Sequence, residues 1–160
     1  MAVKQCIAFG ELDTYGNLPG EREMTIQLTP QQAIIYAMIS TSASDNAMTD
    51  VELSRIGWIV KELPAFEGFD ENSLIVEAQA CGRVVSGADG LNTVLDLIAA
   101  ALPEHMRETA YVLAAEIAAS DQRSSPEERR FLQLLGVRLG LPPLITAALA
   151  RAAVARHRKA

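Results

Sequence analysis

One pattern occurs twice in this chain, at residues 43–63 and 119–139, and it constrains the fold more than any other feature of the sequence. Each copy opens with Ala-Ser-Asp at the end of an apolar stretch and carries a Glu seven residues after the Asp. Asp45 and Glu52 therefore match Asp121 and Glu128, and the apolar residues keep the same offset. A repeat that preserves both a hydrophobic face and acidic turn residues predicts a duplicated helical hairpin, with the turns as candidate sites.

Helical signals continue from Thr29 to the C-terminus, separated by Pro, Gly and capping residues. Three segments combine an N-cap residue with a Gln or Glu three positions later, which is how many helices begin: Thr29-Pro30-Gln31-Gln32, Thr49-Asp50-Val51-Glu52 and Ser125-Pro126-Glu127-Glu128. Apolar spacing and the breaks predict seven helices, at about 30–43, 50–63, 70–85, 91–102, 104–119, 126–139 and 143–156.

These elements predict an all-α fold, a bundle of about seven helices built around two related hairpins, 30–63 and 104–139. We expect the two hairpins to pack against each other. The centre of the first helix, Ala33 to Ile39, is apolar all round, which predicts that it is buried.

Residues 1–28 differ from the rest of the chain. Gly and Pro residues separate two short apolar stretches, and Met24, Ile26 and Leu28 alternate with polar residues as in a strand. A short β-hairpin packed on the body and a loosely ordered arm are both compatible with this pattern. We therefore divide the chain into an N-terminal arm or hairpin, 1–28, and a helical domain, 29–160.

The composition favours a cytoplasmic protein. The 160 residues fit one domain that needs no disulfide or metal to fold. Cys6 and Cys81 lie far apart, which argues against a disulfide framework and against a dithiol redox centre. Met1 to Gly10 lacks the features of a secretory signal, and no span is apolar enough to cross a bilayer.

The net charge of −6 is unevenly distributed. The last ten residues carry four positive charges, on Arg151, Arg156, Arg158 and Lys159, so the remainder of the chain has a charge of −10. An acidic body disfavours nucleic acid and suits hard cations or basic partner surfaces. The terminal cations either complement a helix dipole, the interpretation we favour, or contact a membrane or partner.

Six carboxylates at the two predicted turns are candidate metal ligands: Asp45, Asp50, Glu52, Asp121, Glu127 and Glu128. Ca²⁺ and Mg²⁺ prefer such all-oxygen ligands, and Zn²⁺ also accepts carboxylates. Neighbouring carboxylates repel one another unless a positive group lies between them. If the two hairpins pack symmetrically, both turns can contribute to one cation site.

Helix capping offers a competing explanation for most of these acids. Glu52 and Glu128 occupy the third position of capping boxes, and Asp50 and Glu127 gain from the positive end of the helix dipole. Asp45 and Asp121 are then the informative residues, because an Asp at a helix C-terminus opposes the dipole. An EF-hand is excluded, since Asp50 stands where that loop requires Gly and Ile56 where it requires Glu.

Other chemistry-bearing residues form no recognisable site. The pattern occurs a third time in weaker form, as Asp89-Gly90 followed by Asp96. We interpret this copy as a helix break with Gly90 at positive φ. His105, expected in the first turn of a helix, and His157 belong to no ligand-spaced set. Phosphate-loop, zinc-protease and nucleophile-elbow motifs are absent from the sequence. We therefore expect a protein that is not an enzyme, with structural roles for Cys81 and His105.

With both turns placed, the chain resembles the tellurite-resistance TerB-like family over roughly residues 30–156. The matching stretches run from Ala43-Ser44-Asp45-Asn46 through Asp50-Val51-Glu52, and from Ala119-Ser120-Asp121-Gln122 through Pro126-Glu127-Glu128. The resemblance implies an all-α, divalent-metal-binding stress-response module. It implicates Asp45, Glu52, Asp121, Glu127 and Glu128 as the acidic patch, with Asp50 as a further candidate.

The resemblance also implies complexes with membrane-embedded partners, and hence a position at the inner face of the membrane. The Gly that follows each Asp in the family is replaced here by Asn46 and Gln122. Gln enters the left-handed region less readily than Asn, which predicts altered geometry in the second turn. Our first hypothesis is thus a cytoplasmic module that binds Ca²⁺, Mg²⁺, Zn²⁺ or Mn²⁺. The alternative is a metal-independent helical scaffold that docks a protein or membrane-associated complex through its acidic patch or basic tail.

Overall fold

The computed structural model of the chain describes residues 26–42, 49–120 and 125–159. These residues form seven α-helices: α1 (Pro30–Ser42), α2 (Asp50–Glu62), α3 (Leu74–Val85), α4 (Gly90–Ala101), α5 (Glu104–Ala119), α6 (Pro126–Arg138) and α7 (Pro143–Arg156). The predicted all-α fold is confirmed. Most of the predicted N-terminal hairpin or arm lies outside the described residues, and its described part, 26–28, is neither helix nor strand.

Two short 3-10 turns join α2 to α3: η2 (Pro64–Phe66) and η3 (Glu71–Ser73). The helix predicted at 70–85 therefore begins with a tighter turn and becomes α-helical only at Leu74. Asp70 caps this start, because its carboxylate accepts a hydrogen bond from the Asn72 N–H at 3.0 Å.

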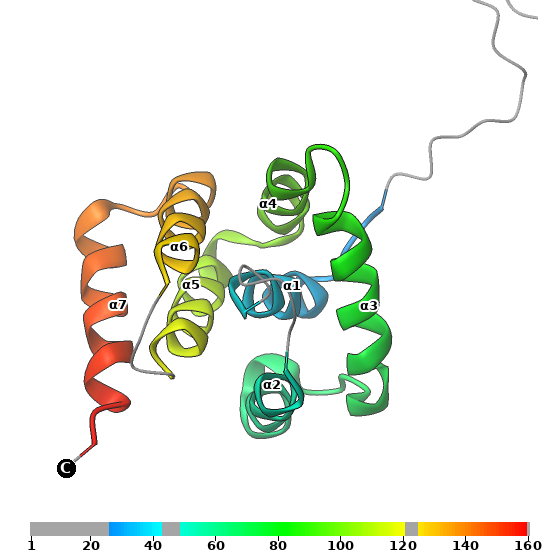
Figure 1. Cartoon of the computed structure of the whole chain (residues 1–160), viewed down its shortest axis with the longest axis horizontal. Coiled ribbons are helices and arrows are strands. Elements are labelled where there is room, and N and C mark those ends of the chain that lie inside the picture. Colours follow the sequence, from blue (N-terminus) through cyan, green and yellow to red (C-terminus); the bar gives the residue numbers. More distant parts are fainter. Residues whose placement is uncertain (1–25, 43–48, 121–124, 160) are drawn as a thin grey trace, which may run out of the picture.

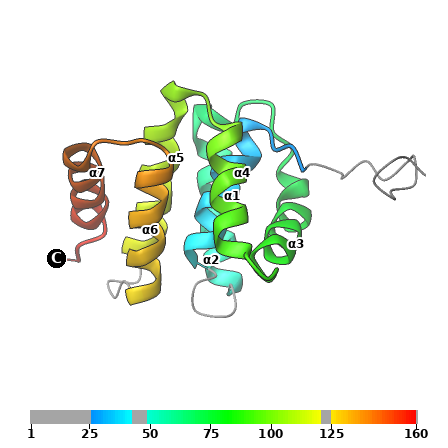
Figure 2. The same ribbon diagram turned by 90° about the horizontal axis from the view of Figure 1, so that it is seen from above.

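The first helix lies at the centre of the bundle. Figure 1 shows α1 between α3 and α5, with α2 and α4 on its two other sides. Its most extensive contact is with α5, while α6 packs on α5 and α2 on α1, so the two predicted hairpins do pack together through their first helices. In Figure 2, α7 lies at one end of the molecule and α3 at the other.

The central position of α1 explains its composition. Ten consecutive residues, from Ala33 to Ser42, are buried, which confirms the prediction for Ala33 to Ile39. A helix surrounded by neighbours has no solvent-facing side on which polar residues would be favoured. Of its buried polar residues, Thr41 forms a local bond, from its hydroxyl to the Ala37 carbonyl at 2.8 Å.

A glycine-centred cap turns the chain from α6 into α7. Gly140 adopts a φ of +68°, and the Leu141 N–H donates to the Gly136 carbonyl at 3.0 Å, as in a Schellman motif. Arg107 of α5 donates to the Leu139 carbonyl at 3.2 Å and ties this end of α6 to α5. The cap thereby directs α7 back along α5, with which it packs.

The break before α4 is confirmed, but the reason predicted for Gly90 was wrong. Its φ is not positive; among the described glycines only Gly68 and Gly140 have a positive φ. A Cβ at position 90 would instead overlap the backbone carbonyl of Val85. Steric crowding at this turn, and not left-handed backbone, requires the glycine.

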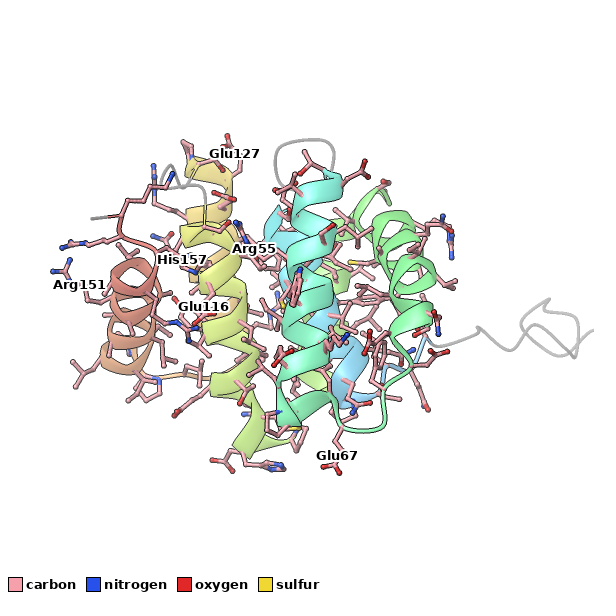
Figure 3. All side chains as sticks on the ribbon, turned by 90° about the horizontal axis from the view of Figure 1, so that it is seen from below. Arg55, Glu67, Glu116, Glu127, Arg151 and His157 are labelled. Atoms are coloured by element: carbon pink, nitrogen blue, oxygen red, sulfur yellow. The ribbon has the colours of Figure 1, made fainter. Side chains whose placement is uncertain are left out.

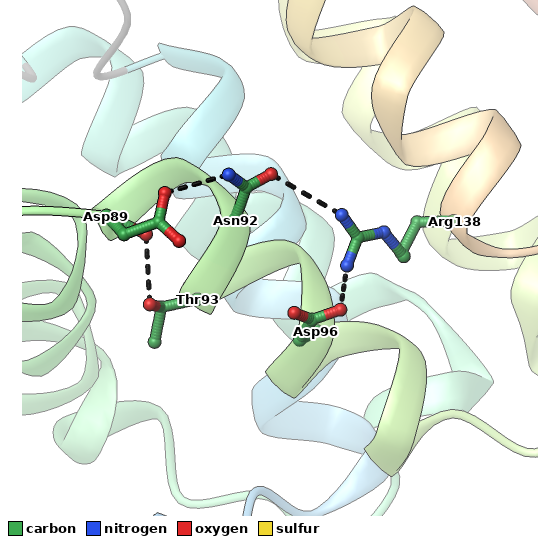
Figure 4. A network of polar contacts seen from close by, with 5 residues as sticks. All are labelled: Asp89, Asn92, Thr93, Asp96 and Arg138. Carbon is green, nitrogen blue, oxygen red and sulfur yellow. Dashed lines mark hydrogen bonds and ion pairs between the residues drawn. The ribbon is translucent and has the colours of Figure 1, made fainter.

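The two aspartates of the same segment hold helices in place. Asp96 forms an ion pair with Arg138 of α6, and Arg138 also contacts the Asn92 side chain at 3.4 Å (Figure 4). Asn92 in turn donates to the Asp89 carboxylate at 2.8 Å. This third, weaker copy of the acidic pattern therefore links α4 to α6 structurally.

Candidate functional site

The capping boxes predicted at the starts of α2 and α6 are present, and Thr29 and Gln32 exchange the same two bonds at the start of α1. The Glu52 N–H donates to the Thr49 hydroxyl at 3.3 Å, and Glu52 Oε2 accepts from the Thr49 N–H at 2.7 Å and its hydroxyl at 2.8 Å. In the second copy, the Glu128 N–H donates to Ser125 Oγ at 3.1 Å and Glu128 Oε2 accepts from the Ser125 N–H at 2.7 Å. The two glutamates therefore satisfy backbone donors that would otherwise be unpaired at the helix starts.

The Glu52 carboxylate is also held in its ionised form. Partial burial opposes ionisation and by itself would raise the pKa. The Ser42 hydroxyl and the two hydrogen bonds from Thr49 act in the opposite direction and outweigh burial. The positive charge of Arg55 adds to them, so the pKa of the Glu52 carboxyl is lower than its ordinary value of 4.5.

Ser42 connects the end of α1 to this carboxylate. Its side chain is 3% exposed, and its hydroxyl has no hydrogen-bond partner within ordinary bonding geometry in the described part of the chain. It nevertheless lies near enough to favour the ionised form of Glu52. The hydroxyl therefore acts on the Glu52 carboxylate and connects the end of α1 to the start of α2.

Glu128 differs from Glu52 in its burial. It is the one charged residue in the buried core of the described chain, with 8% of its surface exposed. A buried carboxylate is costly unless it accepts hydrogen bonds, and the Ser125 backbone supplies one of them. Glu128 is therefore part of the buried core, whereas Glu52, its counterpart in the first copy, is only partly buried.

The first turns of α2 and α6 also carry Asp50 and Glu127, whose side chains are exposed. Neither carboxylate forms an ion pair or hydrogen bond in the part of the chain that the structure describes. Figure 3 shows Glu127 and the N-terminal end of α2 at the same edge of the molecule, while Glu67 lies at the opposite edge. The structure thus brings the N-terminal ends of α2 and α6 to one edge.

The remaining two predicted ligands, Asp45 and Asp121, lie outside the described residues. Within residues 26–42, 49–120 and 125–159, no three Asp, Glu, His or Cys side chains are grouped closely enough to hold a metal ion. The four described acids are therefore placed as two pairs, one at each helix start, and not as a completed cluster.

Sequence reasoning missed Arg55 as a neighbour of the acidic turn. It stands three residues after Glu52 on α2 and contributes a positive charge there (Figure 3). Helical spacing is the signal that could have found it, because residues three apart lie on the same face of a helix. The acidic edge is thus partly compensated by a cation of the chain itself.

Cys81 is structural, as predicted. Its side chain is completely buried and contacts the Ser40 hydroxyl at 3.5 Å. Burial raises the pKa of the Cys81 thiol to about 11, although the contact with Ser40 acts in the opposite direction. At neutral pH the side chain is an unreactive thiol. His105 is exposed in the first turn of α5, where the sequence predicted it.

None of the helices in the described part of the chain combines the length and the apolar character that crossing a membrane requires.

A family model described as tellurite resistance protein TerB matches residues 31–152. The chain belongs to the TerB family. The match extends from the first turn of α1 into α7 and includes both capping boxes and both acidic turns, so the resemblance stated above is confirmed. Neither the curated proteins nor the solved structures gave a significant match to this TerB-family chain.

Proposed function

We propose that this TerB-family chain is a non-enzymatic module that binds a divalent cation at its acidic edge and takes part in the cytoplasmic response to tellurite or a related stress. The ligands would come from the two turns and the helix starts that follow them: Asp45, Asp50, Glu52, Asp121, Glu127 and Glu128. Ca²⁺, Mg²⁺, Zn²⁺ and Mn²⁺ are all compatible with carboxylate oxygens.

The observation that carries this proposal is that Asp50 and Glu127 occupy corresponding places in the first turns of α2 and α6. Each is an exposed carboxylate in the first turn of its helix, and the two helices begin at the same edge (Figure 3). Capping explains why an acid is favourable there, but it leaves both carboxylates without a partner in the described structure. A cation bound at this edge would provide a positive partner for carboxylates that the described chain leaves unpaired.

Glu52 and Ser42 support the same site. The capping-box hydrogen bonds from Thr49 both reach Oε2 of Glu52. The carboxylate is already ionised well below neutral pH, so a cation would not compete with a proton there. The buried Ser42 hydroxyl adds a neutral oxygen beside it.

Thermal unfolding with each of the four cations, compared with EDTA, tests the proposal. A cation present at about 100 times its Kd should stabilise the fold by about 2.7 kcal/mol, which raises the Tm by roughly 5–10 °C for a chain of this size. Asp45→Asn combined with Asp121→Asn should abolish the shift, and Asp50→Asn with Glu127→Gln should reduce it. Glu67→Gln, at the opposite edge, is the matched control and should keep the full shift. The cation proposal is wrong if no ion raises the Tm.

Unpaired cations near the C-terminus favour a second candidate function, a metal-independent scaffold that docks a protein or a membrane-associated complex. Arg151, Arg158 and Lys159 are exposed and have no acidic partner among the described residues. Partner capture that persists in EDTA, decreases with salt and is lost on changing these three residues to Glu would support this function over cation binding.

A further inference from the structure

The outer face of α2 carries large apolar side chains that no described element covers. Val51 is 69% exposed and Trp58, the single Trp of the chain, is 68% exposed. Seven residues separate them, so they lie on one side of the helix, while Ile56 and Val60 occupy the buried side. Exposed indole groups on soluble proteins are more typical of contact surfaces than of ordinary solvent-facing positions.

Trp58 stands between two surface hollows. A hollow of about 330 Å³ lies between α2 and η3, with apolar Val60 and Leu74 and the backbone of Gly57 among its lining, and with Lys61 and Glu71 contributing charges. On the other side of the indole, Asp50, Val51 and Arg55 line a shallower hollow of about 550 Å³. Trp58 therefore lines two depressions in this surface.

The backbone and packing of α2 do not require a glycine at position 57. It lies in the interior of α2, where Gly costs roughly 0.5–1 kcal/mol relative to Ala. Its φ is not positive, and an added Cβ would meet only Leu74 Cδ2, at an ordinary contact distance of 3.7 Å. What the glycine does is keep the hollow beside Trp58 open.

The segment that forms α2, η2, η3 and the start of α3 is predominantly acidic, although its two bases, Arg55 and Lys61, each line one of the hollows beside an acid. Residues 50–77 contain seven acidic side chains and two basic ones. Five of the acids are exposed: Asp50, Glu62, Glu67, Asp70 and Glu71. Complementary charge guides association and excludes wrong partners, so a basic partner suits this face and an acidic one does not.

We propose that the outer face of α2 is a docking surface for a basic amphipathic helix of a partner protein. An apolar side chain of that helix enters the Gly57 hollow and packs against Trp58, and its Lys or Arg residues face the surrounding acids. The contact requires no cation, because neither the indole nor the hollow depends on one.

The position of Trp58 supplies an intrinsic probe, since no other Trp contributes to the emission. The probe ligand is a synthetic amphipathic helix of Leu and Lys, and a Leu/Glu helix with the same apolar face is its control. In EDTA, the Leu/Lys peptide should shift the Trp58 emission to shorter wavelength, protect it from iodide quenching and bind less tightly as salt increases. The Leu/Glu peptide should do none of these.

A pair of glycine variants separates specific docking from general attraction to an acidic protein. Gly57→Leu fills the hollow and should weaken binding of labelled Leu/Lys peptide by at least about tenfold while the helix remains folded. Gly82→Leu is the control on α3, because a Cβ there meets nothing within 4 Å, and its affinity should match the unmodified protein.

Three results would overturn the docking surface: no change in Trp58 emission with the Leu/Lys peptide, equal affinities of the two glycine variants, or self-association that itself buries Trp58. The last result, visible by sedimentation over a concentration series, would mean that a second copy occupies the face. Because every measurement is made in EDTA, its outcome is independent of whether the acidic turns bind a cation.

Discussion

The Glu116 carboxylate of α5 forms a salt bridge with Arg156 of α7 at 2.8 Å. One of the four positive charges near the C-terminus therefore has a structural role. Only 12% of the Glu116 side chain is exposed, whereas 72% of the Arg156 side chain is. A nearly buried carboxylate needs a partner more than an exposed guanidinium does, so the bond fixes the end of α7 on α5.

Arg156→Ala should therefore lower the free energy of unfolding by about 0.5–1 kcal/mol, whereas Arg151→Ala and Arg158→Ala should change it by less than about 0.5 kcal/mol. Urea unfolding at neutral pH measures all three. In a Glu116→Gln background the effect of Arg156→Ala should shrink. An undiminished effect in that background would show that Arg156 stabilises α7 in some other way.

The ionised Glu52 carboxylate makes the stability of the fold depend on pH. Its folded pKa is below the ordinary value of 4.5, so its stabilising contribution is present above about pH 4.5 and is lost as the pH falls through the folded pKa. Between pH 7 and pH 3, the unmodified protein should lose more stability than Glu52→Gln does. Urea midpoints at each pH provide the comparison, and parallel curves for the two proteins would contradict this assignment.

The Thr49 and Ser125 hydroxyls should each contribute measurably to the stability of the fold, and by similar amounts. Thr49→Ala and Ser125→Ala each remove the acceptor of one helix-start N–H and should cost about 1 kcal/mol of unfolding free energy. Thr49→Ser and Ser125→Thr retain a hydroxyl and should remain close to the unmodified protein. Denaturant unfolding distinguishes these outcomes, and an alanine variant that costs nothing would mean that the cap is not formed in solution.

The sequence was sufficient to predict the helices because their signals are local. A capping box, a Pro at the first helical position and a broken apolar stripe each depend on residues within one or two turns of one another. The same locality placed Glu52 and Glu128 at helix starts, where capping was one of the two roles predicted for them.

The parts of the site that sequence reasoning missed arise between elements. Ser42 and Glu52 approach each other only because α1 and α2 fold back together, and no spacing rule links those two residues. Gly90 was assigned the wrong reason because its constraint is the nearby Val85 carbonyl, a fact of three-dimensional crowding. The exposure of Trp58 likewise depends on which side of α2 the neighbouring helices cover.

Three glycines in helix interiors should respond differently to the same change, because their surroundings differ. Gly57→Ala and Gly82→Ala add a methyl group where there is room and should stabilise the fold by roughly 0.5–1 kcal/mol. Gly136→Ala places a Cβ 2.9 Å from Thr146 Cγ2 and 3.3 Å from the Tyr111 ring, where α5, α6 and α7 meet. It should destabilise by about 1–3 kcal/mol, as measured by urea unfolding. A stabilised Gly136→Ala would show that α7 can shift away from α6 at little cost.

Cys81 should report on opening of the core. With Cys6 changed to Ser, the remaining thiol is completely buried and its pKa is raised to about 11 by that burial, so very little thiolate is present at pH 8 and the sulfur is out of reach of reagents. We expect an aromatic disulfide reagent to modify Cys81 only when the fold opens, at a rate that increases with urea in step with unfolding. Cys81→Ala should leave the protein folded but less stable, because the contacts of sulfur with Ser40 and its neighbours are lost. Rapid modification in the absence of urea would contradict a closed core around α1 and α3.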